Sequence, residues 1–161
     1  MPRRLRIRLA TEADARAIGV LVRRVARQDV LPDQSAAAGR HLMAMMTARA
    51  ERQRIREGQR YHVAELDGRL AGVVAMRDDR HVFRLFVGRR FRNLGIGRAL
   101  LRKALADARH RAGTRTFTLY SSAHALGAYV RMGFLKAGRS VPRGPGKVTA
   151  TPMVYRVPRH N

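Results

Sequence analysis

Residues 85–101 of the chain read LFVGRRFRNLGIGRALL. An apolar run that predicts a buried strand leads into a basic, glycine-containing loop, and a helical pattern follows at once. The start of that helix would direct several free backbone N–H groups and the positive end of the helix dipole at one point. Gly95 and Gly97 would leave room for a ligand close to the backbone. The stretch therefore predicts an anion-binding site.

Arginine side chains reinforce this interpretation, and two common phosphate motifs do not apply. Four arginines would add positive charge and paired N–H donors to the loop: Arg89, Arg90, Arg92 and Arg98. A P-loop requires Lys and Ser or Thr after its last glycine, whereas Gly97 is followed by Arg98 and Ala99. A dinucleotide motif requires Gly or Ala where Leu100 stands. On spacing alone, the stretch also fits a helix start with ordinary packing glycines.

The hydropathy pattern on both sides of this stretch predicts a mixed α/β domain. Alternation and apolar runs predict strands at residues 5–9, 61–66, 70–76, 81–87, 114–120, from 134 onward and at 153–157. Helical spacing predicts helices at residues 12–30, 35–57, 95–111 and 123–132. Asp67-Gly68 predicts a hairpin turn, and residues 138–148, rich in Gly and Pro, are expected to form a loop.

Positive charge dominates the composition of the 161 residues. Lys and Arg number 34 against 11 Asp and Glu, which gives a formal net charge of +23. Such a charge indicates an anionic partner, such as nucleic acid or a phosphorylated ligand, or an arginine-rich solvated surface. The absence of cysteine excludes disulfides and thiol nucleophiles. No apolar run approaches the roughly 20 residues of a membrane-spanning helix, so we expect a cytoplasmic protein without a membrane partner.

Two blocks of the sequence resemble a known family. Residues 92–97 (Arg-Asn-Leu-Gly-Ile-Gly) match the Arg/Gln-x-x-Gly-x-Gly/Ala motif that binds pyrophosphate in the GNAT superfamily of N-acetyltransferases. Val87 is similar to the valine that ends the preceding strand in that family. Residues 121–134 resemble the later motif in which Ser, Ala and Tyr lead to Gly-Phe, and residues 152–155 resemble the last strand. The resemblance spans about residues 5–157.

The resemblance implies a GNAT-like α/β fold in a single domain over residues 1–161. Its central sheet would be mixed and mostly antiparallel, with about six or seven strands flanked by about four helices. It also implies acetyl transfer from acetyl-CoA, without a metal, to the primary amine of a small molecule or peptide by direct attack. The residues that would bind the coenzyme are Phe86, Val87, Arg92, Asn93, Leu94, Gly95, Ile96, Gly97, Arg98, Ser122 and Ala125.

Two catalytic roles and an acceptor pocket follow from the same resemblance. Tyr129 stands at the family's acid position and would protonate the leaving thiolate. The backbone N–H of Val87 would stabilise the thioester oxygen as negative charge builds on it. The acceptor amine would bind between residues 28–40 and 139–150, the segments that form the acceptor pocket in such folds.

The general base is the role with the most alternatives. His81 lies six residues before Val87, where the protein-acetylating branch of the family has a carboxylate. A neutral imidazole can act as a general base near neutral pH. His81 could instead satisfy the turn at residues 78–79, which holds two aspartates. Asp29, Glu65 or a chain of ordered water are the other candidates.

Two further functions fit parts of the sequence. An arginine-rich nucleic-acid-binding module is favoured by the net charge and by an arginine series that could follow phosphates along a helix. That series is Arg49, Arg52, Arg54 and Arg56. No helix-turn-helix spacing or zinc finger supports the module, and aromatic residues, at 6%, are few for base stacking. The other alternative is a domain that binds acetyl-CoA without catalysis, and a homodimer is compatible with each function.

Overall fold

The structure is a computed structural model that describes residues 3–159 of the chain. Within these residues the five α-helices are α1 (Ala15–Asp29), α2 (Ala36–Met45), α3 (Ala48–Arg56), α4 (Ile96–Ala112) and α5 (Leu126–Arg131). The eight strands are β1 (Leu5–Leu9), β2 (Arg60–Leu66), β3 (Arg69–Arg77), β4 (His81–Val87), β5 (Thr116–Ser121), β6 (Leu135–Lys136), β7 (Val141–Arg143) and β8 (Val148–Arg156). Short 3-10 turns are formed by Glu12–Asp14, Leu31–Asp33 and Arg89–Phe91.

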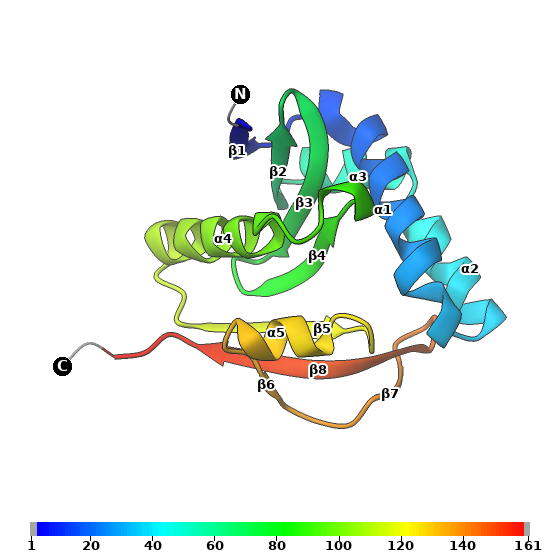
Figure 1. The fold of residues 1–161 in the computed structure, drawn as a ribbon. Coiled ribbons are helices and arrows are strands. Elements are labelled where there is room, and N and C mark those ends of the chain that lie inside the picture. The colour runs from blue at the N-terminus through cyan, green and yellow to red at the C-terminus, as the bar shows by residue number, and fades with distance from the viewer. Residues whose placement is uncertain (1–2, 160–161) are drawn as a thin grey trace.

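The strands form one sheet in the order β1-β2-β3-β4-β5-β8-β6, with β7 paired to β8. Every pairing is antiparallel except that of β4 with β5, which is parallel. Figure 1 shows the consequence: β1–β4 with α1–α3 make one half of the molecule, and β5–β8 with α5 make the other. The expected mixed, mostly antiparallel α/β fold is confirmed.

The two halves of the sheet are joined through very few residues. β4 and β5 pair only at His81–Thr118 and Val82–Leu119. The register between β3 and β4 shifts just after these pairs, from Met76–Val82 to Ala75–Arg84, so Phe83 has no partner and forms a β-bulge. A bulge bends its strand and increases the local twist. Beyond Phe83, β4 therefore turns away from β5 and their backbones separate.

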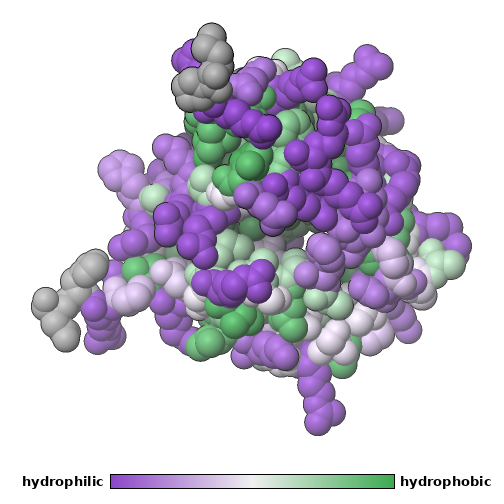
Figure 2. Space-filling view, in the orientation of Figure 1, coloured by the Kyte–Doolittle hydropathy of each residue, from purple (hydrophilic) through white to green (hydrophobic). Residues whose placement is uncertain are grey.

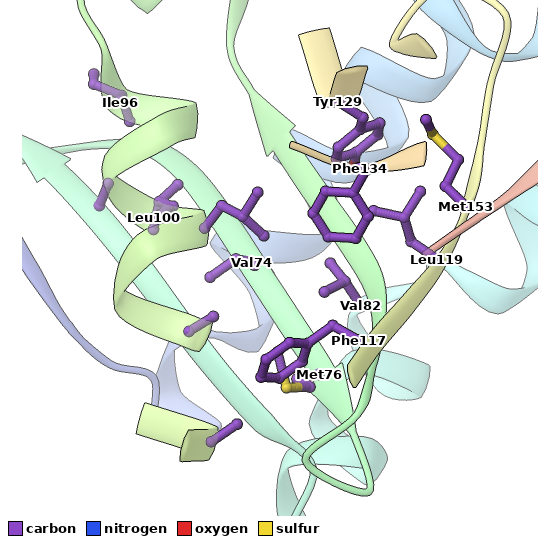
Figure 3. Packing of buried hydrophobic residues seen from close by; sticks show 14 of the residues in the cluster. Val74, Met76, Val82, Ile96, Leu100, Phe117, Leu119, Tyr129, Phe134 and Met153 are labelled. Carbon is purple, nitrogen blue, oxygen red and sulfur yellow. The ribbon is translucent and has the colours of Figure 1, made fainter. Parts of the chain in front are cut away.

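A hydrophobic core covers each face of the sheet. On one face, α4 packs through buried residues such as Leu100 and Ala104 against a cluster that includes Phe117 and Phe134. Figure 3 shows Leu100 and Val74 on one side of this cluster and Phe134 with Tyr129 on the other. On the opposite face, α1 contributes the second cluster, with Ile18, Val22, Val25, Tyr61 and Val73 buried together. Both halves of the sheet are thus anchored, and the gap between them is bounded by packed elements.

One predicted helix is wrong in its extent. The pattern over residues 35–57 forms two helices, α2 and α3, instead of one. Thr47 ends the first and caps the second, because its Oγ1 accepts the Ala50 N–H at 3.1 Å while its own backbone is extended. Apolar periodicity continues across the break, so hydropathy alone did not reveal it.

The C-terminal elements also differ from the sequence prediction. The helix expected from residue 123 begins at Leu126, because Ser122 Oγ accepts the Ala125 N–H in a turn at 3.2 Å. The last strand begins at Val148 instead of residue 153. The segment expected to be a loop contains β7, which pairs with the early part of β8. These local changes bring the strand number to eight.

The surface of the described residues is strongly hydrophilic. Figure 2 shows hydrophilic residues over most of one face, with hydrophobic residues reaching the surface in smaller groups. None of the helices within residues 3–159 combines the length and hydrophobicity that crossing a bilayer requires.

The crossing of α1 over α3 depends on Gly19. A Cβ at this position would lie 2.9 Å from the backbone nitrogen of Ala48 and 3.1 Å from its Cα, so the two helices would have to separate. We expect Gly19→Ala to lower the free energy of unfolding by about 1–3 kcal/mol in urea titrations. Gly39→Ala is the control, because a Cβ there meets only the flexible end of Leu31 at 3.4 Å and helix propensity favours alanine. Equal effects of the two substitutions would contradict this account of the crossing.

Candidate active site

A cavity of about 800 Å³ lies where β4 and β5 separate. Its walls come from α1, α2, β4, β5, α5 and the loop between β7 and β8, so residues far apart in sequence meet there. The sequence-predicted site residues that line it are His81, Phe86, Val87, Arg92, Ser122, Ala125 and Tyr129. Both predicted acceptor segments line the same cavity, the first through Gln34 and the second through Val148.

The backbone at the end of β4 offers donors to this cavity. The Gly88 N–H donates to the Ala71 carbonyl at 2.9 Å, while Val87 stands opposite Gly72. In an antiparallel ladder this pattern makes Val87–Gly72 a non-hydrogen-bonded pair. The Val87 N–H therefore points away from β3, toward the side on which β5 has already separated. It is a strand amide without a strand partner at the edge of the cavity.

The start of α4 leaves further amides free. The first helical bond within α4 is donated by the Ala99 N–H to the Gly95 carbonyl at 3.0 Å. The N–H groups of residues 96–98 precede that bond and are the unsatisfied donors of a helix N-terminus. The loop reaches this geometry through left-handed backbone at Asn93 (φ 63°) and Gly95 (φ 79°), a region that Asn and Gly tolerate better than other residues.

The space next to these amides is open. A Cβ placed on Gly95 would meet no atom within 4 Å, and one on Gly97 would meet only Val87 Cγ2 at 3.6 Å. The glycines are therefore not required by packing at this point, in contrast to Gly19. Ile96 is buried in the core, so only its backbone can face a ligand, whereas Leu94 and Arg98 are exposed beside the loop. The arrangement forms an open, donor-rich stretch of backbone that fits an anionic ligand.

Asp29 ties the end of α1 to this loop. Its buried carboxylate accepts hydrogen bonds from Arg92 and from Arg89, the latter at 3.3 Å, and lies 3.8 Å from His124 Nε2. Burial raises the pKa of the Asp29 carboxyl, but the hydrogen bond and charge of Arg92, together with His124 and Arg89, hold it below its ordinary value. Asp29 is thus an ionised partner of the loop arginines and is poorly suited to the alternative role of general base.

His81 is fixed at the other end of β4. Its Nδ1 shares a hydrogen bond of 2.8 Å with Thr118 Oγ1, and its ring lies 5.2 Å from that of Tyr120. Burial and, to a lesser extent, the charge of Arg77 lower the pKa of His81 to about 4. Asp79 binds Arg111 at 2.6 Å, so the alternative in which His81 pairs with this turn is not what the structure shows. His81 is neutral at physiological pH and faces the cavity.

Glu65, another candidate base, lies outside the cavity. It pairs with Arg8 at 2.5 Å across the β1–β2 ladder. Arg8 also binds Asp14 at 2.8 Å, so these three side chains form an ion network at the start of α1. Glu65 thus has a structural partner and no contact with the candidate site.

A buried ion network behind the cavity wall involves a residue that sequence reasoning missed. Glu51 of α3 is fully buried and accepts hydrogen bonds from the Tyr61 hydroxyl and from Arg84 Nε, the latter at 3.3 Å. Arg54 lies 3.4 Å from the same carboxylate. Arg84 itself lines the cavity from β4. Glu51 stands among the arginines of a helix expected to be solvated, and nothing in the local pattern distinguishes it.

Tyr129 enters the cavity from α5. Its ring packs edge-on against Phe134, with centroids 5.8 Å apart (Figure 3). Burial alone raises the pKa of its hydroxyl, and no hydrogen bond within the described residues contributes. The hydroxyl is therefore protonated at neutral pH and faces a cavity, as a proton donor requires. Within residues 3–159 no three or more His, Asp or Glu side chains cluster as a metal site would require.

Comparison with known proteins identifies the family. The acetyltransferase (GNAT) domain model matches residues 27–157. Among curated proteins, no sequence matches the chain. The chain belongs to the GNAT acetyltransferase family, which confirms the predicted recognition and, at the level of the family, the predicted class of acetyl-CoA-dependent N-acetyltransferase.

Solved structures share the fold at low sequence identity. A GCN5-related N-acetyltransferase from Rhodopseudomonas palustris gives a TM-score of 0.78 at 18% identity, covering 98% of this chain and 99% of that chain. The PaiA N-acetyltransferase from Thermoplasma acidophilum, in complex with coenzyme A, gives 0.76 at 15% identity, with 95% and 99% coverage. YncA from Salmonella typhimurium, with its cofactor acetyl-CoA, gives 0.66 at 21% identity, with 98% and 96% coverage.

The Glu51 network is expected to be essential for stability. Glu51→Gln leaves the Arg84 guanidinium buried without its counter-charge, so we expect the free energy of unfolding to fall by about 3–5 kcal/mol. The control is Glu12→Gln, which removes an exposed pair with Arg56 (2.8 Å) and should change stability by less than about 1 kcal/mol. Chemical denaturation measures both. A loss at Glu51 no larger than that at Glu12 would refute the structural role.

His81 is expected to titrate well below an ordinary histidine. Its NMR C2–H resonance, assigned by its loss in His81→Gln, should shift near pH 4 instead of about 6.5. Because the unfolded chain binds this proton below about pH 6.5 and the folded chain only near pH 4, the unfolding free energy falls as pH drops across this window. His81→Gln should remove the part of this decrease in unfolding free energy that His81 causes. Titration of His81 at or above pH 6.5 would contradict the burial argument.

Proposed function

We propose that this chain transfers the acetyl group of acetyl-CoA to a primary amine by direct attack. The observation that carries the proposal is the open, donor-rich backbone formed by the end of β4 and the start of α4. The coenzyme has a pyrophosphate and a further phosphate, which suit free amides at a helix N-terminus. PaiA, with coenzyme A, and YncA, with acetyl-CoA, share the fold and support the same assignment.

The residues present fit this coenzyme at several points. The N–H groups of residues 94–98 would hold the pyrophosphate, and Gly95 and Gly97 leave space for it. Arg92 would add charge from a side chain that Asp29 already holds at the edge of the cavity. Ser122 and Ala125, which line the cavity from the far side, would bind the rest of the coenzyme. Acetyl-CoA supplies the activated acetyl thioester.

The chain would stabilise the attack through the backbone of β4. As the amine nitrogen bonds to the thioester carbon, negative charge builds on the carbonyl oxygen, and the unpartnered Val87 N–H can donate to it. Removal of one such donor costs about 3–4 kcal/mol in characterised enzymes. Because the donor is main chain, a change of the Val87 side chain would leave it in place.

Proton transfer from the amine and proton transfer to the leaving thiolate complete the reaction. The attacking amine must lose a proton, because an alkylammonium of pKa about 10 has no free lone pair. Because its pKa of about 4 makes the imidazole a weak base, His81 would accept a hydrogen bond from the water that carries this proton away from the amine. When the carbon–sulfur bond breaks, the Tyr129 hydroxyl would donate its proton to the leaving thiolate, and the second proton lost by the attacking nitrogen would restore the hydroxyl. The products would be the N-acetylated amine and coenzyme A.

A carboxylate introduced beside the free amides of α4 tests the coenzyme site. Gly97→Asp keeps the fold, since the site has room for a side chain, but sets a negative charge where the pyrophosphate would lie. We expect acetyl-CoA to bind at least about tenfold more weakly in calorimetry. Gly97→Asn, which adds a side chain of the same size without the negative charge, is the matched control and should bind nearly normally. Equal affinities for both variants would reject this coenzyme site.

The role of Tyr129 is tested by removal of one oxygen. Tyr129→Phe keeps the aromatic packing and should lower turnover at least about tenfold, with coenzyme affinity unchanged, because general acid catalysis is lost. Tyr155→Phe is the matched control, since Tyr155 packs on the same Phe134 ring at 5.5 Å but does not line the cavity. Steady-state rates of coenzyme release measure both. Unchanged turnover of Tyr129→Phe would remove Tyr129 from the mechanism.

A further inference from the structure

The cavity contains no carboxylate available for a cationic substrate group. Among the described residues that line it, Asp29 is the only carboxylate, and Arg89 and Arg92 already occupy it. On the side away from the loop between β4 and α4, the positively charged Arg77 and Arg143 line the wall. An amine that carried a second positive charge would have no counter-charge there. The electrostatics of the wall instead favour an anionic group.

Arg143 is the arginine positioned to bind such a group. The neighbouring Arg84 uses its donors internally, on Glu51 and on the carbonyls of Phe83 and Met45. Arg143 bonds only the Arg139 carbonyl, through one terminal nitrogen at 2.9 Å, and its Nε is buried without a partner. A buried donor without a partner is costly. The second terminal nitrogen, Nη1, donates to no group within the described residues, so an oxyanion that entered the cavity could bind it.

The position of Arg143 relates it to the reacting end of the site. Its guanidinium lies over the Tyr120 ring, 5.7 Å from the centroid, and the same ring lies 5.2 Å from the His81 ring. Arg143 and His81 therefore both lie next to the Tyr120 ring. A molecule with an anionic group at Arg143 and an amine at His81 would need only a short spacer between the two.

The loop that carries Arg143 is held in place on both sides. Gln34 forms two hydrogen bonds with the backbone of Thr149, each 2.8 Å long, which fasten the loop after α1 to the start of β8. Gly146 packs so closely on the His41 ring that any side chain there would overlap it. Arg143 is thus presented from a fixed segment, and little ordering is needed when a ligand binds.

We propose that the acetyl acceptor is a short primary amine that carries a carboxylate or phosphate group, and that Arg143 binds this group. The inference rests on the proposed function for the amine end of the molecule. Arginine suits the role because its planar fork bonds two oxyanion oxygens at once. Arg143 is therefore a specificity-determining residue, and polyamine substrates are disfavoured.

The test compares probes that differ only at the end away from the amine. Calorimetry of the protein saturated with coenzyme A uses 4-aminobutyrate, 4-aminobutanamide and 1,4-diaminobutane, with 3-aminopropylphosphonate to distinguish phosphate from carboxylate. An ω-amino acid series from glycine to 6-aminohexanoate finds the spacer length. We expect the best anionic probe to bind at least about tenfold more tightly than its matched amide and diamine.

Two variants with the same charge change separate recognition from general electrostatics. Arg143→Gln should reduce the preference to less than about threefold. Arg139→Gln removes an exposed arginine whose side chain does not line the cavity. This variant should keep the preference for anionic probes. Equal losses in both variants, a preference for the diamine, or no binding of any anionic probe would overturn the proposal. If coenzyme A itself fails to bind, the proposed function fails, and the same probes added to the free protein still decide whether Arg143 selects anions.

Discussion

β4 and β5 are hydrogen-bonded through two residue pairs, and the bulge at Phe83 then turns the strands apart. The unpartnered Val87 amide and the cavity both depend on that separation. It exposes the Val87 amide on the side away from β3, and it opens the cavity into which α5 directs Tyr129. A fully paired β4–β5 ladder would use the same amide for sheet structure. Because the strands separate, the Val87 N–H has no partner in the sheet and can donate a hydrogen bond to a ligand.

Two buried carboxylates fix the arginines around this opening. Asp29 holds Arg92 in the loop between β4 and α4, and Glu51 holds Arg84 in the wall that β4 forms. Both pairs join segments from different parts of the chain, so each ion pair also sets the distance between a helix and the β4 region. The chain has 34 basic and only 11 acidic residues, so most of its positive charge has no such partner. The cavity shares this imbalance, which is why we propose an acceptor that carries an anionic group.

The sequence predicted the strand, loop and helix around residues 85–101 well, because the signals for them are local. Glycines at a strand–helix junction determine where free amides lie, and the structure brings Val87, Arg92 and Tyr129 to one cavity as expected. Interactions between distant residues were not predictable in this way. Glu51 resembled one more polar residue on a basic helix, although Tyr61 and Arg84 surround it. The pKa of His81 likewise depends on burial by segments that hydropathy cannot place.

We propose that main-chain amides at the end of β4 and the start of α4 bind the acyl carrier. The most direct measurement is a ¹⁵N-resolved NMR titration of the backbone amides with acetyl-CoA. We predict that the largest shifts fall on Val87 and on residues 94–98, with the amides of β1 and β6 unaffected. Shifts confined to the outer arginine-rich helices α1 and α3, or none at millimolar acetyl-CoA, would contradict the account.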